Sequence, residues 1–159
     1  MRKLIMLIII LGVIISAYAK SNNAVVIKSN PASKVILVAV FADTDTDYKN
    51  SLIAQLKTQY EPKYQVKKVV IKKAKELNNE QFRLLIVMDQ LKAWLAMNGQ
   101  TKAIMKLSNK DNAIFLMTSG DKKWQWKEKD VHHIASASEK PLFSKTWLEL
   151  KTKADLLLK

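Results

Sequence analysis

The chain of 159 residues has no cysteine and only three glycines, three prolines and two histidines. Without cysteine, disulfides, thiol catalysis and cysteine-ligated metal sites are all excluded. A domain without covalent cross-links depends on its apolar core, and a chain of this length is long enough to bury one. Because glycine is so scarce, a loop glycine such as Gly120 stands out.

Arginine is also scarce, although the formal net charge is +13. Arg83 is the only arginine after the first 19 residues. Proteins that read nucleic-acid bases usually rely on arginine, so nucleic acid is not an expected partner. The lysines are spread along the chain, which favours a solvated surface. The alternative is affinity for an anionic envelope surface, such as lipid headgroups or a cell-envelope polymer.

The N-terminus has the pattern of a secretory signal. Arg2 and Lys3 precede an apolar segment, Leu4 to Ile15, and Ala17-Tyr18-Ala19 fits an A-x-A cleavage site. The apolar segment is shorter than the roughly 20 residues that span a bilayer. We therefore expect residues 1–19 to be a cleavable signal peptide, cut after Ala19, and the mature protein to be periplasmic or secreted. An uncleaved anchor is the alternative.

Residues 34–159 are expected to form one α/β domain, after an N-terminal tail or edge strand at residues 20–33. Short apolar runs predict strands, and helical spacing of apolar residues predicts helices. The expected strands are Val35–Phe41, Gln65–Ile71, Arg83–Met88, Ala113–Met117 and Val131–Ile134. The expected helices are Thr46–Gln59, Thr101–Leu107 and a C-terminal helix starting near Pro141, with a short turn at Ala74–Asn79. Such alternation predicts a parallel sheet with helices on both faces.

An acidic, hydroxyl-rich loop, Asp43 to Asp47, directly follows the first strand. In open α/β sheets, ligands usually bind at the carboxyl ends of the strands, so this loop belongs to a candidate ligand edge. Its residues are also good helix N-caps. Three carboxylates at alternate positions resemble a cation loop, but the glycine and distal glutamate of a calcium loop are missing. The N-cap interpretation is therefore favoured over a metal site.

The mature chain resembles the flavodoxin-like family over nearly its whole length. The similarity lies in the loop after the first strand, in Ala93-Trp94 after the third, in Thr118 to Asp121 after the fourth and in Ser136 to Ser138 after the last. The resemblance implies an α/β flavodoxin-like three-layer sandwich, with a five-stranded parallel sheet in the order 2-1-3-4-5. It also implies a ligand edge built by the loops after strands one, three and four.

The cofactor implied by this resemblance is FMN. The cofactor-binding residues would then be Thr44, Thr46, Trp94, Thr118, Ser119, Gly120 and Trp124. The family's phosphate loop reads roughly T-x-T-G-x-T, whereas the loop here has no glycine and carries three carboxylates that would repel a phosphate. FMN binding is therefore the alternative rather than the favoured interpretation.

The aromatic residues and the histidines leave further questions open. Trp94, Trp124 and Trp126 could stack on a flat ligand, or they could cover the core where a helix is missing. His132 and His133 point to opposite faces of a strand, so they cannot easily share a metal ion. Neither histidine is paired with a recognisable nucleophile, and we assign no catalytic residue and no metal site.

Three hypotheses for the function remain. The favoured one is a non-catalytic ligand- or partner-binding protein of the cell envelope. The second is an FMN-dependent electron-transfer protein, and the third is a binder of anionic envelope surfaces. The sequence supports neither hydrolase nor transferase chemistry, and it leaves the physiological ligand and the oligomeric state open.

Overall fold

The computed structural model describes residues 27, 29–78, 80–91, 97–107, 110–119, 124, 126 and 130–159. The predicted signal peptide at residues 1–19 and the predicted site residues Trp94 and Gly120 lie outside this part of the chain. No helix among the described residues has the length and apolar character needed to cross a membrane.

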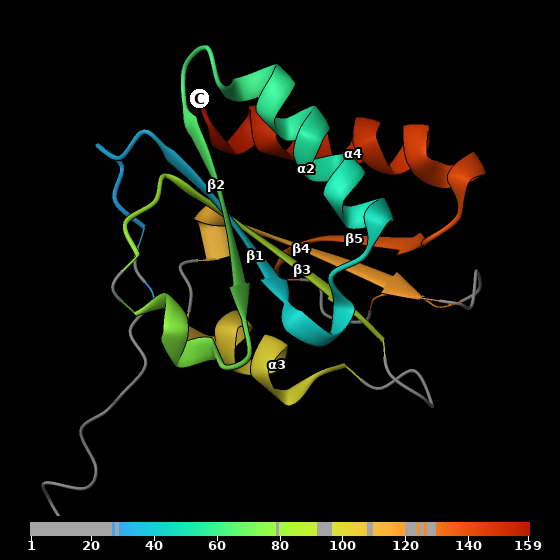
Figure 1. Cartoon of the computed structure of the whole chain (residues 1–159). Coiled ribbons are helices and arrows are strands. Elements are labelled where there is room, and N and C mark those ends of the chain that lie inside the picture. Colours follow the sequence, from blue (N-terminus) through green and yellow to red (C-terminus); the bar gives the residue numbers. More distant parts are fainter. Residues whose placement is uncertain are drawn as a thin grey trace, which may run out of the picture.

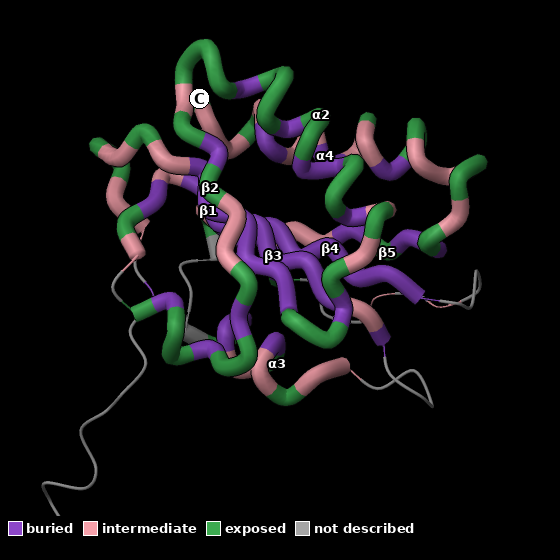
Figure 2. Tube along the Cα trace, viewed as in Figure 1, coloured by how far each residue is buried: buried purple, intermediate pink, exposed green. Residues whose placement is uncertain are grey.

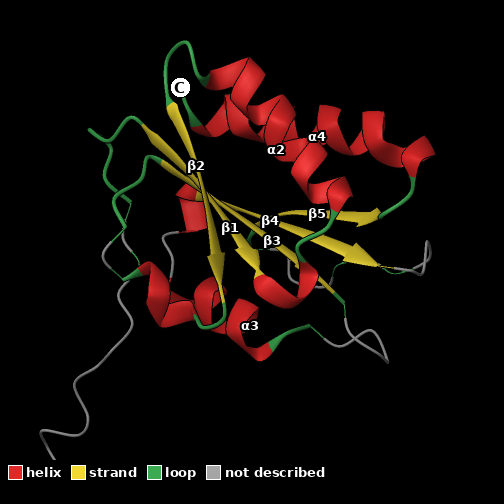
Figure 3. Ribbon diagram, in the orientation of Figure 1, coloured by secondary structure: helices red, strands yellow, loops and turns green. Residues whose placement is uncertain are grey.

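Five parallel strands form one sheet in the order β2-β1-β3-β4-β5 (Figures 1 and 3). They are β1 (Val35–Phe41), β2 (Gln65–Ile71), β3 (Leu84–Gln90), β4 (Ala113–Ser119) and β5 (His132–Ala137). The three central strands are buried almost throughout, because layers of helices cover both of their faces. Strand order and layers confirm the predicted α/β flavodoxin-like three-layer sandwich.

The helices divide between the two faces of the sheet (Figure 1). One face carries α2 (Asp47–Tyr60) and α4 (Phe143–Leu157), while the other carries α3 (Gly99–Leu107) and the 3-10 helix η2 (Ala74–Leu77). The described residues also form the 3-10 turns η1 (Ala42–Thr44), η4 (Lys110–Asn112) and η5 (Lys140–Leu142). Thr46 is the N-cap of α2, as the acidic loop predicted.

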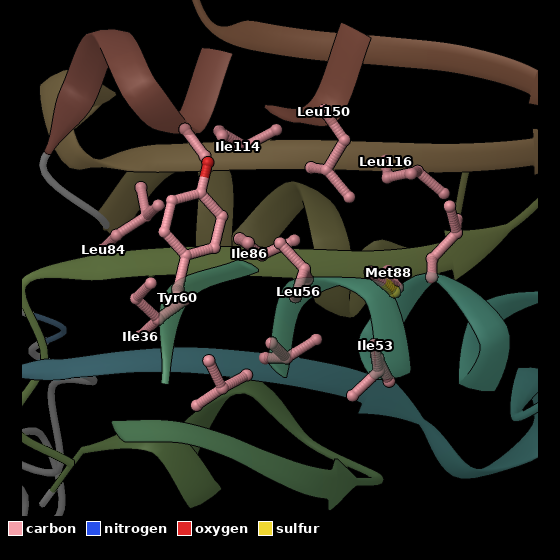
Figure 4. Close-up of a cluster of buried hydrophobic side chains, with 14 of the residues drawn as sticks. Ile36, Ile53, Leu56, Tyr60, Leu84, Ile86, Met88, Ile114, Leu116 and Leu150 are labelled. Carbon is pink, nitrogen blue, oxygen red and sulfur yellow. The ribbon is translucent and has the colours of Figure 1, made fainter. Parts of the chain in front are cut away.

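The larger core lies between the sheet and the α2–α4 layer. Leu56 from α2 and Leu150 from α4 meet strand residues such as Ile86 and Ile114 there (Figure 4). Each of these side chains is fully buried, and each contributes about 1.5–3 kcal/mol by leaving water. This pairing of α2 with α4 holds their N-terminal ends near the carboxyl ends of the strands.

The second core lies on the opposite face, beneath α3 and η2. It includes Leu77, Ile104 and Phe115, and Ile27 joins it although it precedes the first strand by eight residues. Figure 2 shows the central strands buried between the two layers. The described residues before Val35 form no strand, but the buried Ile27 ties this segment to the domain.

Three strands extend beyond the predicted limits. Asp89 and Gln90 were expected in a loop but belong to β3, and Thr118 and Ser119 belong to β4. In β5, residues 135–137 are likewise part of the strand. The prediction ended each strand with its apolar run, whereas a strand ends where its backbone pairing ends. Here Gln90 pairs with Thr118, which in turn pairs with Ser136.

Candidate functional site

The two predicted threonines of the first loop bond within the loop itself. The buried Thr44 hydroxyl donates to the carbonyl oxygen of Phe41 at 3.1 Å. The Thr46 hydroxyl accepts the backbone N–H of Lys49 as the cap of α2. The Thr46 hydroxyl thus stabilises the start of α2 and the Thr44 hydroxyl stabilises the preceding turn η1, and the structure brings neither to the cavity described below.

A fully buried lysine, which was not among the predicted site residues, donates a hydrogen bond to this loop. Lys49 is 0% exposed, and its Nζ donates to the carbonyl oxygen of Thr44 at 2.6 Å. Burial lowers the pKa of Lys49 to about 8, and the carboxylates of Asp89, Asp45 and Asp43 oppose this shift. Lys49 stands one helical turn before Leu52 and Ile53, a spacing that could have placed it on the buried face.

A buried carboxyl group at the end of β3, that of Asp89, lies close enough to Lys49 for their charges to interact. Asp89 is 1% exposed, and its side chain accepts the Thr101 hydroxyl and the Gln90 backbone N–H. Burial raises the pKa of Asp89, although these two hydrogen bonds and the charge of Lys49 favour its ionised form. The sequence held one signal that Asp89 is buried. The apolar run before it leads directly to Asp89 with no turn residue between them.

The remaining predicted residues lie on or after β4. The buried Thr118 hydroxyl donates to the carbonyl oxygen of Asp89 at 3.2 Å and so ties β4 to β3. Ser119 is buried at the end of β4, within the strand rather than in a loop cradle. Trp124 is half-buried, and it lines the same cavity as Ser119. Of the seven predicted site residues, the structure brings Ser119 and Trp124 together.

This cavity lies at the carboxyl ends of β4 and β5 and has a volume of about 240 Å³. Besides Ser119 and Trp124, it is lined by residues of β5, η5 and α4. These are Ala135, Ser136, Ala137, Leu142, Lys145, Thr146 and Glu149. Three of the lining hydroxyl side chains are more than nine-tenths buried, those of Ser119, Ser136 and Thr146. The cavity therefore combines hydroxyl donors and acceptors with an indole ring and two charged side chains.

A cluster of three hydroxyl groups connects the cavity to α2. Ser136 and Thr146 bond to each other at 2.6 Å. The Tyr48 hydroxyl lies 3.0 Å from Ser136 Oγ and donates to Thr146 Oγ1 at 2.9 Å. The sequence analysis assigned no role to this cluster. One signal was available for Thr146, because it precedes Leu150 and Ala154 at four-residue spacing on the inward face of its helix.

The other aromatic residues cover the second core. Trp126 stacks on His133 with ring centroids 5.1 Å apart, and it packs against the second core. Trp124 contacts Trp126 edge to face at 5.6 Å. Trp126 thus covers part of the second core, and covering the core was one of the two predicted roles.

The acidic loop and the histidines hold no metal cluster among the described residues. Asp45 instead forms an ion pair with Lys68 of β2 at 2.7 Å. Asp47 stands in the first turn of α2, where a negative charge suits the helix dipole. His133 Nδ1 lies 3.1 Å from the carbonyl oxygen of Val131.

No known family model matches this chain, and no curated protein matches it either. Among solved structures, a chain in the crystal structure of the Francisella novicida lysine decarboxylase LdcF aligns with a TM-score of 0.47 and 12% sequence identity. The alignment covers 79% of this chain and 18% of that one. This chain therefore spans less than a fifth of the decarboxylase chain, and a similarity of this strength does not extend to function.

Proposed function

We propose that this chain is an exported, divergent flavodoxin-like protein of the cell envelope, and that it binds a small, uncharged polar ligand. The observation that carries the proposal is the cavity at the carboxyl ends of β4 and β5, with its three buried hydroxyl groups beside Trp124. Export rests on the pattern of residues 1–19.

The chemistry of the lining favours a hydroxylated ligand. The hydroxyl hydrogens of Ser136 and Thr146 already bond to the carbonyl oxygens of Ala137 and Leu142, so toward sugar or polyol hydroxyls these two groups act as acceptors. The indole of Trp124 offers an apolar face on which a sugar ring can rest. The volume of about 240 Å³ lies below the usual range of about 300–1,000 Å³ for sites of drug-sized molecules, so the ligand is small.

The geometry of the first loop favours this proposal over FMN binding. The hydroxyls of Thr44 and Thr46 already bond within the loop, and Asp43, Asp45 and Asp47 surround it with negative charge. A bound phosphate would have to displace those hydrogen bonds and approach three carboxylates.

Binding to named probes tests the proposal. We would titrate the purified protein with D-glucose, N-acetyl-D-glucosamine and glycerol, and in parallel with FMN, and follow heat of binding and thermal unfolding. We expect saturable binding of at least one sugar. The variant Thr146→Val should weaken that binding about tenfold, because it removes one hydroxyl from the lining at nearly constant volume.

The variant Thr58→Val is the matched control, since Thr58 is exposed in the last turn of α2 and does not line the cavity. Saturable quenching of FMN emission without sugar binding would replace the proposal with the electron-transfer hypothesis. Binding only to anionic vesicles, with a steep fall at high salt, would replace it with the envelope-surface hypothesis. Absence of sugar binding at millimolar concentrations would contradict it.

A further inference from the structure

A second and larger cavity lies at the same edge of the sheet, on the α2 side of the hydroxyl cluster. Its volume is about 470 Å³, within the usual range of about 300–1,000 Å³ for small-molecule sites. It is lined by Asp47, Tyr48, Ser51, Ser138, Lys140 and Phe143. None of these belongs to the predicted site residues, and none lines the smaller cavity.

One wall of this cavity is an aromatic pair that is held in place by its surroundings. Tyr48 and Phe143 meet edge to face, with ring centroids 5.7 Å apart and an angle of 87° between the rings. Both pack against the larger core, and the Tyr48 hydroxyl is bound to Ser136 and Thr146. The pair comes from the first turns of α2 and α4, so it forms a preformed apolar surface between two helices.

Two charges of opposite sign line the same cavity. The Asp47 carboxylate comes from the first turn of α2, and the Lys140 ammonium comes from η5 after β5. Both side chains are exposed, and neither belongs to any of the ion pairs within the described part of the chain. A simple anion would be attracted by Lys140 but repelled by Asp47, and a simple cation would meet the reverse.

We infer that this cavity binds a small zwitterion with an apolar body, of the free amino-acid type. The ligand's ammonium pairs with Asp47, its carboxylate pairs with Lys140, and its side chain packs on Tyr48 and Phe143. Each of these two contacts is a charge-assisted hydrogen bond, which is stronger than a hydrogen bond between neutral groups. This site is separate from the cavity of the proposed function, and it requires no ligand to be bound there.

Titration calorimetry with three matched probes tests the inference. L-Phenylalanine carries both charges, phenethylamine lacks the carboxylate, and 3-phenylpropanoate lacks the ammonium. We expect phenylalanine to bind the purified protein saturably, and each single-charge analogue to bind at least about tenfold more weakly, since each loses one ion pair and meets one like charge.

Two variants then assign the charges. Lys140→Gln should lower the affinity for phenylalanine at least about tenfold without lowering the affinity for phenethylamine. Asp47→Asn should lower the affinity for phenylalanine similarly without lowering the affinity for 3-phenylpropanoate. Lys145→Gln is the control, because Lys145 lines only the smaller cavity and should leave phenylalanine binding unchanged. Circular dichroism checks that each variant is folded.

Three results would overturn the inference. They are absence of phenylalanine binding, equal affinity for the three probes, and an equal loss of affinity in Lys145→Gln. Sugar binding in the smaller cavity is read out separately with Thr146→Val, so failure of one site does not imply failure of the other.

Discussion

Lys49 shows how a single buried charge holds the edge of the sheet together. Its ammonium donates to the carbonyl oxygen of Thr44 and so joins η1 to α2. Removing a charge from water is costly, and the carboxylates of Asp89, Asp45 and Asp43 offset part of that cost.

The pKa of Lys49 leads to a prediction for stability against pH. In the folded protein the pKa is lowered from 10.5 to about 8, so between these values the unfolded chain binds more protons. The free energy of unfolding should therefore rise with pH in this window, by on the order of 2–3 kcal/mol between pH 7 and 10. Urea denaturation across this range measures it.

The variant Lys49→Met should abolish the rise, while Lys57→Met, an exposed lysine of the same helix, should retain it. The measurement should stop near pH 10. Burial and the Asp155 carboxylate raise the pKa of Tyr60, so Tyr60 lowers stability as the pH rises beyond 10. A rise that persists in Lys49→Met would show that another group causes it.

At the scale of elements, the two described tryptophans between β4 and β5 have different surroundings. Trp126 covers the second core and stacks on His133, whereas the neighbouring Trp124 lines the smaller cavity. The spacing of the two tryptophans alone does not separate these roles.

Truncating each tryptophan should separate them. Trp126→Ala uncovers apolar side chains such as Phe115 and should lower the free energy of unfolding by about 2–4 kcal/mol. Trp124→Ala should cost less than half as much, because Trp124 lines the smaller cavity and contacts Trp126 but is not among the described side chains that pack against the second core. Chemical denaturation of both variants measures the difference, and equal losses would mean that Trp124 also supports the core.

Strand limits show which part of each element was predictable. The predicted limits of β1 and β2 match the observed ones, because in both segments the last apolar residue of the strand is also the last one whose backbone pairs. In β3 and β4 the last residues are polar, namely Asp89, Gln90, Thr118 and Ser119. Neighbouring strands pair with them, which a single segment cannot reveal.

At the scale of the whole molecule, the described residues cover the two faces of the sheet unequally. Among them, two long helices pack on one face, whereas the nine residues of α3, the turn η2 and Ile27 pack on the other. Ile27 is 1% exposed, so it contributes to this thinner layer as a core residue would.

We therefore expect Ile27→Ala to lower the free energy of unfolding by about 2–4 kcal/mol, as for other large core residues. Leu148→Ala is the control, because Leu148 is 63% exposed on α4 and its loss should change stability by less than about 0.5 kcal/mol. Similar values for the two variants would show that the segment before Val35 is not part of the folded domain.

The candidate site was predictable only in part. The sequence placed a ligand edge at the carboxyl ends of the strands, and Ser119 and Trp124 do line a cavity there. Ser136, Thr146 and Tyr48 come from β5, α4 and α2, and they share no motif. Their hydroxyls meet because α2 and α4 pack side by side, and this packing is a property of the assembled core.

The sequence by itself determined the class of fold and placed the N-cap of α2 in the acidic loop, while the strand order was implied by the family resemblance. Apolar periodicity, N-cap chemistry and the handedness of parallel crossovers are local or nearly local effects. Tertiary structure alone decided which polar groups became buried and which met. Tyr48 bonds to Ser136 and Thr146 across 88 and 98 positions of the chain, and the charge of Asp89 acts on Lys49 across 40 positions, so no local pattern reveals these contacts.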